Sequence, residues 1–217
     1  MSSLHNLGGM QGFGPVWATA EGTAFYTEDE RRVFRLMMGL MAGGWCDTDG
    51  FRDAVESLPV PTYARECFPV NYFLGMEKQL AERGLIQPGD LEAWMKGEKP
   101  AGRPDKPPPI MAPGRESPEP ARFKVGDRVK IGTIDRQGHN RLPNYLRGQI
   151  GTITAERGLV DFPDALAARE GRRPQPVYTV EFLAREVWGN PDAGDDRISA
   201  EIFQAYIEGK VIEGRAP

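Results

Sequence analysis

Hydrophobic positions in the first half of the chain follow a helical spacing. Residues 33, 36, 37, 40 and 41 are all apolar, and this spacing predicts an amphipathic helix. The four residues TEDE at 27–30 precede it as a capping box, and two glycines at 43–44 end it. Similar but shorter patterns predict helices from about residue 48, over about 70–83 and over about 88–95. The first half is therefore predicted to be helical.

The second half has the pattern of short strands. Residues 123–131 alternate apolar and polar side chains around a Gly-Asp pair. Residues 145–160, 177–182 and 203–207 add further runs of β-branched and aromatic residues. Short strands joined by glycine-rich turns are typical of a small barrel of the SH3-like kind. We therefore expect an α+β chain, with the helices first and an SH3-like β-barrel second.

Proline marks the division between these halves. Eight of the 19 prolines fall within residues 99–120, a stretch that cannot form a helix or an inner strand. We expect an N-terminal arm and helical domain over residues 1–98, a Pro-rich linker over 99–122 and the barrel domain over 123–217. Residues 1–25 are rich in glycine and have no regular period. We expect this arm to be extended and to become ordered only by packing on another surface.

Composition and charge exclude several classes of protein. The 217 residues carry a net charge of −4, with no basic stretch that would indicate a nucleic-acid surface. No window approaches the roughly 18 uninterrupted apolar residues that a membrane-spanning helix needs. The first residues do not have the pattern of a secretory signal. Two cysteines cannot form a disulfide scaffold, and we expect a cytoplasmic protein with reduced thiols.

Metal ligands and nucleophiles are scarce. The two histidines, His5 and His139, are far apart in the sequence, and no Cys-x-x-Cys or His-Glu-x-x-His motif occurs. A metal site needs three or four ligands, usually at short spacing. We therefore predict no metal site in this chain, and we interpret it as a partner of a catalyst rather than a self-sufficient enzyme.

Four motifs, in order along the chain, resemble the β subunit of nitrile hydratase. Residues 5–15 read HNLGGMQGFGP, against the family's H-D-x-G-G-x-x-G-[FYL]-G-P, with asparagine for the usual acid at position 6. Residues 138–151 reproduce G-H-x-R followed by Y-x-R-G-x-x-G. Residues 174–182 read PQPVYTVEF, against the family's P-x-x-Y-T-V-x-F, with one residue more between proline and tyrosine. Residues 186–189 match E-L-W-G, with valine in place of leucine. The resemblance covers nearly the whole chain, with the linker as its weakest stretch.

The resemblance implies a hydro-lyase that hydrates nitriles to amides. In that family the β subunit pairs with an α subunit, as an α-β heterodimer and often as α2β2. The α subunit's Cys-x-x-Cys-Ser-Cys holds an iron(III) or cobalt(III) ion, so this chain would carry no cofactor and would be inactive alone. Two of those cysteines are oxidised to sulfinate and sulfenate, and two β arginines donate hydrogen bonds to their oxygens. Planar, permanently charged guanidinium groups suit such anions.

The motifs locate the site residues in this sequence. The arginine of the acidic D-x-F-R segment is Arg52, and the arginine of G-H-x-R is Arg141. The resemblance implies that Arg52 and Arg141 both take part in catalysis. We interpret Arg147 as structural, and we expect His139 to orient its loop rather than to act as a base. The substrate pocket would use Phe51, Phe68 and Tyr72. The segment 68–72 reads FPVNY where the family has Y-Y-x-H-W, so this wall of the pocket differs from the family pattern.

Two alternatives stay open. Thiocyanate hydrolase is a relative in which the two halves of this chain form separate subunits, so one continuous chain favours nitrile hydratase. A non-enzymatic assembly or activator protein could also carry an SH3-like barrel. Such a protein would not need Arg52 and Arg141 together with the glycine-rich arm. A neighbouring reading frame that encodes Cys-x-x-Cys-Ser-Cys would decide between these functions. This sequence does not distinguish iron from cobalt, because the ligands would lie in the other chain.

Overall fold

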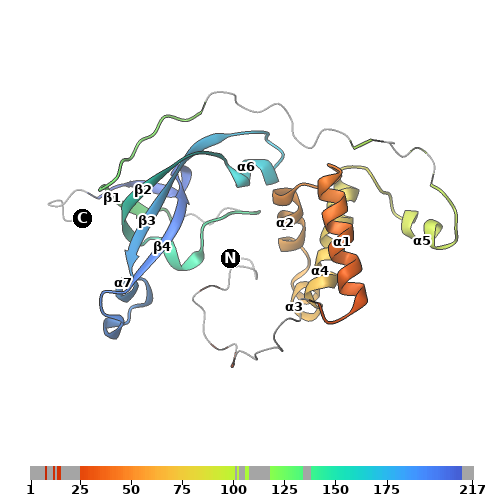
Figure 1. Ribbon diagram of the computed structural model, residues 1–217, viewed down its shortest axis with the longest axis horizontal. Coiled ribbons are helices and arrows are strands. Elements are labelled where there is room, and N and C mark those ends of the chain that lie inside the picture. The colour runs from red at the N-terminus through yellow and green to blue at the C-terminus, as the bar shows by residue number, and fades with distance from the viewer. Residues whose placement is uncertain are drawn as a thin grey trace.

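The computed structural model describes residues 25–100, 118–133 and 138–211, together with Gly8, Gly12, Gly14, Pro15, Gly102, Lys106 and Pro107. Within these ranges the chain forms a helical region and a sheet region that lie beside each other (Figure 1). The mixed α and β class is as predicted. Most of the N-terminal arm and most of the linker lie outside the described residues, so the expectations for them stay predictions.

The helical region begins with the predicted cap. The Thr27 side chain accepts a hydrogen bond from the Glu30 amide, and the Glu30 carboxylate accepts one from the Tyr26 amide. The helix over about 70–83 begins two residues earlier than expected, because Pro69 fits the first turn of a helix. A six-residue helix after Pro59 was not predicted, since it is too short to show a period. The helices are α1 (Glu28–Ala42), α2 (Thr48–Glu56), α3 (Val60–Arg65), α4 (Phe68–Glu82) and α5 (Asp90–Met95).

The core of the helical region lies where α2 crosses α4. Met37, Phe51, Val55 and Met76 form its buried cluster. A Cβ on Gly75 would lie only 2.2 Å from Cγ2 of Val55, so the two helices can approach this closely only because α4 carries glycine there. This crossing fixes α2, and with it the side chains on the far face of α2.

The sheet region is an antiparallel sheet of five strands in the order β4-β3-β2-β1-β5. Its inward positions alternate as expected, with Val129, Ile131, Ile153 and Val180 almost fully buried. The strands are β1 (Arg128–Ile131), β2 (Ile150–Asp161), β3 (Pro174–Leu183), β4 (Arg197–Phe203) and β5 (Ile207–Lys210). Two short helices, α6 (Pro163–Ala167) and α7 (Ala184–Trp188), and three single turns of 3-10 helix, η1 (Asn144–Leu146), η2 (Pro191–Ala193) and η3 (Gln204–Tyr206), connect them.

The outer strands β4 and β5 are joined by η3 alone. The prediction of a single strand over residues 203–207 is therefore wrong, because this segment contains the turn η3. A flat sheet of five strands would place its edges roughly 19 Å apart. A three-residue 3-10 turn spans only roughly 6–8 Å, so the sheet must curl to bring its edges together. Among the described residues, β4 and β5 do not pair with each other, and closure into the predicted barrel is not observed.

A buried glutamine joins the end of the linker to the sheet. The Gln204 side chain donates a hydrogen bond to the carbonyl of Pro120 and accepts one each from the Arg122 amide and the Tyr178 hydroxyl, at 2.8–3.0 Å. Gln204 is 1% exposed. Because an unpaired buried amide is costly, these bonds fix the path of residues 120–122 along the sheet.

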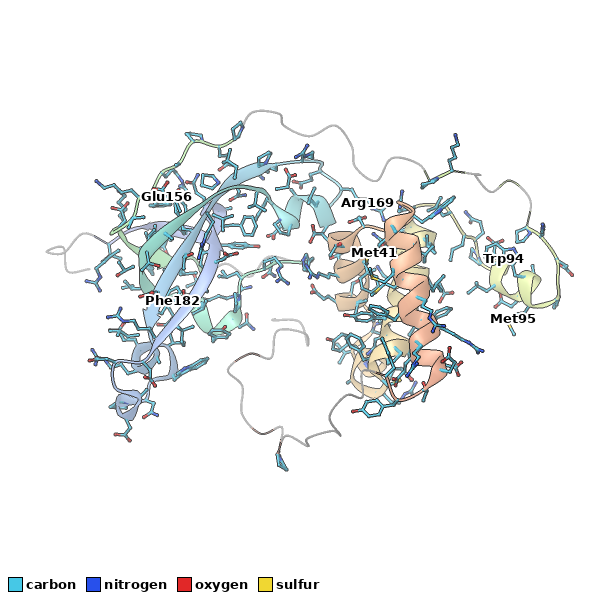
Figure 2. All side chains as sticks on the ribbon, in the orientation of Figure 1. Met41, Trp94, Met95, Glu156, Arg169 and Phe182 are labelled. Carbon is cyan, nitrogen blue, oxygen red and sulfur yellow. The ribbon has the colours of Figure 1, made fainter. Side chains whose placement is uncertain are left out.

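The two regions meet where α2 lies against α6 (Figure 1). Arg169, just after α6, donates hydrogen bonds to the carbonyl and the carboxylate of Glu82 at the end of α4, at 3.1 and 3.3 Å. Figure 2 shows Arg169 between the two regions, while Trp94 and Met95 on α5 lie away from the other helices. No helix within the described residues is long and apolar enough to cross a membrane.

Candidate functional site

A cavity of about 230 Å³ lies where the sheet region reaches the helical region. Its wall contains all five residues that the sequence singled out, namely Phe51, Arg52, Phe68, Tyr72 and Arg141. We call it the arginine pocket. Four of these five residues come from α2 and α4, and only Arg141 comes from the sheet region.

Helix α2 sets the position of Arg52. The Asp47 carboxylate caps the helix by accepting a hydrogen bond of 2.7 Å from the Gly50 amide. Phe51 is 4% exposed and enters the helical core. The next side chain, Arg52, is rotated by about 100° around the helix and faces the pocket. Glu56, one turn later, lines the same pocket.

The loop that carries Arg141 is held against α2 by His139. Nδ1 of His139 lies 2.8 Å from the Glu56 carboxylate, and the His139 amide donates a hydrogen bond of 2.9 Å to the Asp53 carboxylate. The imidazole is fully buried. Gly138 has a φ of 87°, which a residue with a side chain rarely adopts. The expectation that His139 orients its loop therefore has a geometric basis in these contacts.

The Arg141 backbone is fixed from the opposite side by the sheet region. Its amide donates a hydrogen bond of 2.9 Å to the Tyr206 hydroxyl, which in turn bonds to Asp164. Contacts on both sides thus hold residues 139–141 between α2 and the sheet. By contrast, Arg147 donates to Asn140 within the same loop, at 3.4 Å, and does not line the arginine pocket.

The two arginines of the pocket have few partners of their own. Nη1 of Arg52 lies 3.8 Å from the Asp49 carboxylate, which is beyond hydrogen-bond distance. No described residue accepts a hydrogen bond from the Arg141 guanidinium. Burial raises the pKa of Asp49, while the nearby charges of His139, Arg52 and Arg141 oppose that rise. The pocket therefore carries two guanidinium groups whose donors are largely unused.

Three aromatic rings form the opposite wall. The Tyr72 and Phe68 ring centres are 3.8 Å apart, and Phe51 meets Tyr72 edge-on at 5.0 Å. Burial raises the pKa of Tyr72, and the charge of Arg52 lowers it in part. Because the ordinary pKa of a tyrosine is already about 10 and burial raises that of Tyr72, its hydroxyl stays neutral at ordinary pH.

Asn71 also lines the pocket and was not singled out from the sequence. Its side-chain amide donates hydrogen bonds to the carbonyls of Tyr63 and Glu66, at 3.0 and 3.3 Å. Its side-chain oxygen is buried and has no hydrogen-bond partner among the described residues. These bonds tie α4 to α3 and so position Tyr63 beside the pocket.

Sequence reasoning also missed the acidic side of α2. Asp49, Asp53 and Glu56 follow one another at intervals of four and three residues, which places them on one helix face. That spacing was the only available signal of an acidic helix face, and the same spacing is equally typical of a face exposed to solvent. Only the fold shows that the loop carrying His139 covers it. Among the described residues, no three histidine, cysteine or acidic side chains come together as metal ligands.

Comparison with known proteins identifies the family. Residues 1–120 match the model of the nitrile hydratase beta subunit, N-terminal, and residues 112–209 match the model of the corresponding C-terminal part. The chain is 32% identical over 217 residues to a nitrile hydratase subunit beta of Rhodococcus erythropolis, covering 96% of this chain and 99% of that one.

Two further relatives place this match in context. Identity to the low-molecular weight cobalt-containing nitrile hydratase subunit beta of Rhodococcus rhodochrous is 27%, over 95% of this chain and 99% of that one. Identity to the thiocyanate hydrolase subunit alpha of Thiobacillus thioparus is 30%, but over only 41% of this chain and 71% of that one. With both family models matched along its length, the chain belongs to the nitrile hydratase beta subunit family.

Proposed function

We propose that this chain builds one side of a nitrile-hydrating site, which a metal-bearing α subunit completes. The observation that supports this most strongly is the pair Arg52 and Arg141. They reach one cavity from two different regions of the chain, and their donors are largely unused by the described residues. Guanidinium groups that converge on one cavity in this way are suited to bind an anion.

The anion that fits this proposal is an oxidised cysteine pair on the partner. A sulfinate or sulfenate offers oxygen acceptors at close spacing, and a planar guanidinium can donate two parallel hydrogen bonds to such a group. Burying that anion without a cation would cost several kcal/mol, on the order of 3–5. Arg52 and Arg141 would hold these oxygens and fix their orientation toward the reacting nitrile.

The metal belongs to the partner in this proposal. The arginine pocket is lined by two cationic guanidinium groups, one carboxylate, one amide and aromatic rings, and this set does not fit a metal ion. Cobalt is named for relatives of this chain, including the one from Rhodococcus rhodochrous. We therefore assign to this chain the binding of anion and substrate, with no step carried by a metal of its own.

The aromatic wall would hold the nitrile. Phe51, Tyr72 and Phe68 form a continuous row beside the arginines. An apolar wall of this kind excludes water from the space it covers and strengthens the charge interactions on the other side. His139 and Glu56 act at a distance in this proposal, since they position the loop that carries Arg141.

The fold assignment to an SH3-like barrel is part of the proposal. Five antiparallel strands, the pairing of β1 with both β2 and β5, and the single turn η3 between β4 and β5 support it. The division into segments 1–98, 99–122 and 123–217 is also part of the proposal. It is supported by the order of the described elements, because helices α1–α5 all end before residue 98 and all five described strands begin after residue 122. For the assembly, we propose that two copies of this chain and two α subunits associate as α2β2.

A thiocyanate hydrolase-like subunit is the second candidate. The identity to thiocyanate hydrolase subunit alpha supports it, but the match covers less than half of this chain. Assays with thiocyanate and with a nitrile, made on the same preparation, distinguish the two activities.

Reconstitution tests the proposed function. The chain purified alone should contain no stoichiometric iron or cobalt and should not convert acetonitrile to acetamide. Co-expression with an α subunit that carries Cys-x-x-Cys-Ser-Cys should give a complex with one metal ion per α subunit and measurable amide formation. Turnover with stoichiometric metal in the isolated chain would contradict the proposal, as would an inactive complex at full metal loading.

A further inference from the structure

Two aromatic rings meet at one end of the sheet, where η1 contacts α7 (Figure 1). The rings are those of Tyr145 in η1 and Trp188 in α7, with centres 5.0 Å apart and planes inclined by 36°. Tyr145 also packs against the core of the sheet region, whereas Trp188 is 45% exposed. We call these two rings the aromatic pair.

The backbone on each side holds the aromatic pair in place. Leu146, the next residue in η1, is fully buried in the core. Gly189 follows Trp188 and ends α7 with a φ of 61°, which a residue with a side chain rarely adopts. These residues belong to the motifs at 138–151 and 186–189, but they do not line the arginine pocket. The proposed function therefore does not explain why the motifs contain them.

The glycine-rich motif near the N-terminus reaches the aromatic pair at Gly8. A Cβ on Gly8 would lie 3.0 Å from Cε1 and 3.1 Å from Cδ1 of Tyr145, closer than the roughly 3.5–4.0 Å of an ordinary contact between carbon atoms. The Gly8 backbone thus lies directly against the Tyr145 ring, and only a residue without a side chain can approach so closely. Gly12 and Gly14 differ, because their Cβ positions have nothing within 4 Å and their φ angles are 99° and 76°.

We propose that the aromatic pair binds the N-terminal segment that carries Gly8, so that the chain orders the start of its own arm before a partner binds. Three of the four motifs found in the sequence meet at this one contact, which they would not need if a partner alone ordered the arm. Because glycine loses more conformational freedom on ordering than any other residue, a glycine-rich arm needs a contact of this kind. The sheet region thus supplies the surface that the sequence left unspecified.

The contact also joins the arm to the loop that carries Arg141. Tyr145 follows Arg141 by four positions, and the Arg147 side chain donates a hydrogen bond of 3.4 Å to Asn140 within the same loop. The start of the arm and Arg141 therefore belong to one folded region. A partner that contacts both meets an arm whose first contact is already made, which lowers the conformational entropy lost on association.

Nuclear Overhauser effects in the full chain, without a partner, test the contact. With glycine and tyrosine labelled selectively, a cross-peak is expected between the Gly8 α protons and the Tyr145 ring protons. Gly8→Ala and Tyr145→Phe each remove one labelled group and should abolish this cross-peak. Tyr26→Phe and Gly39→Ala are the matched controls and should keep it, because Tyr26 is 65% exposed and the Cβ position of Gly39 has nothing within 4 Å.

Limited proteolysis with thermolysin provides a second measurement in which the sequence of the arm is unchanged. Tyr145→Ser removes the ring, so cleavage within residues 1–25 should be at least about threefold faster than in the wild type, at a temperature where both are folded. Tyr145→Phe keeps a ring and should be cleaved at the wild-type rate.

Two results overturn the inference. If the cross-peak is absent from the chain alone, the chain does not order its own arm, even if the cross-peak forms once a partner is added. Equal cleavage rates for Tyr145→Ser and the wild type would likewise show that the ring does not hold the arm. If Tyr145→Ser does not fold, the cross-peak in the wild type still decides. Both measurements use the chain without a nitrile, so their outcome is separate from that of the reconstitution that tests the proposed function.

Discussion

The sheet region and the helical region bury their apolar side chains to very different extents. In the part of the chain that the structure describes, the sheet region has one cluster of 16 buried residues, and the helical region has a cluster of four. Ten of the 14 large apolar side chains that remain exposed belong to residues 25–100. The sheet region thus covers most of its large apolar side chains with its own core, whereas the helical region has apolar surface that its own core does not cover.

The candidate site follows this division of roles. The sheet region fixes one loop, residues 138–143, and holds it at Arg141 through Tyr206. The helical region supplies the rest of the arginine pocket. The sheet region thus carries one arginine toward the helical region, which supplies the other residues of the pocket.

The largest effect that tests this contrast is on folding. Phe182 in β3 is 1% exposed and Phe73 in α4 is 37% exposed. Phe182→Ala should lower the free energy of unfolding by about 3–5 kcal/mol, because it leaves a cavity in a closed core. Phe73→Ala should lower it by less than about 1 kcal/mol. Urea unfolding of the two variants beside the wild type measures both, and equal losses would contradict the contrast.

The parts that the sequence could predict are those with a local signal. The cap at Thr27, the helix after it and the alternation of the strands all depend on near neighbours in the chain. The arginines and the aromatic wall came from motifs, and the fold brings all five residues to one pocket. Their chemical roles stay proposals.

Contacts between distant segments could not be predicted. His139 meets Glu56 across 83 positions of the chain, and the Arg122 amide meets Gln204 across 82. In neither pair do the residue types or their spacing in the sequence indicate that the two residues are in contact. Phe34 of α1 and Phe68 of α4 likewise line one cavity of about 170 Å³, and only the packing of the helices brings them together.

A smaller effect concerns the junction between the regions. Arg169 is the one described residue other than glycine with positive φ, at 59°. Arg169→Gly and Arg169→Ala both remove the hydrogen bonds to Glu82, but only alanine keeps the strain of a left-handed backbone. The glycine variant should therefore be more stable than the alanine variant by about 1 kcal/mol. Chemical denaturation of the pair measures this difference, and equal stability would show that the strain is absent.

The smallest effect depends on pH. Burial raises the pKa of Asp49 in the folded chain above its ordinary value, so the stability that its protonated form contributes is present at low pH. That stability is lost as the pH rises through the folded pKa. Asp49→Asn should therefore raise the free energy of unfolding at pH 7 by less than about 1 kcal/mol, which thermal melting detects as a higher melting temperature.

The same comparison at low pH supplies the check. Below the ordinary pKa of an aspartate, at about pH 3, the wild-type carboxyl is protonated in both states, and the gain from Asp49→Asn should disappear. Asp29→Asn is the matched control, since the Asp29 side chain is 85% exposed. A gain for Asp49→Asn that stays constant from pH 3 to pH 7 would contradict the assigned cause.

The central claim is that Arg52 and Arg141 act as paired donors toward an anion of the partner, and turnover of arginine-to-lysine variants tests it most directly. Lysine keeps the charge but loses the planar group with two parallel donors. In the assembled enzyme at full metal loading, Arg52→Lys and Arg141→Lys should each lower turnover at least tenfold, about 1.4 kcal/mol in the barrier. Arg147→Lys, whose side chain bonds to Asn140 outside the pocket, should change stability more than turnover. Wild-type turnover in both Arg52→Lys and Arg141→Lys would contradict the account.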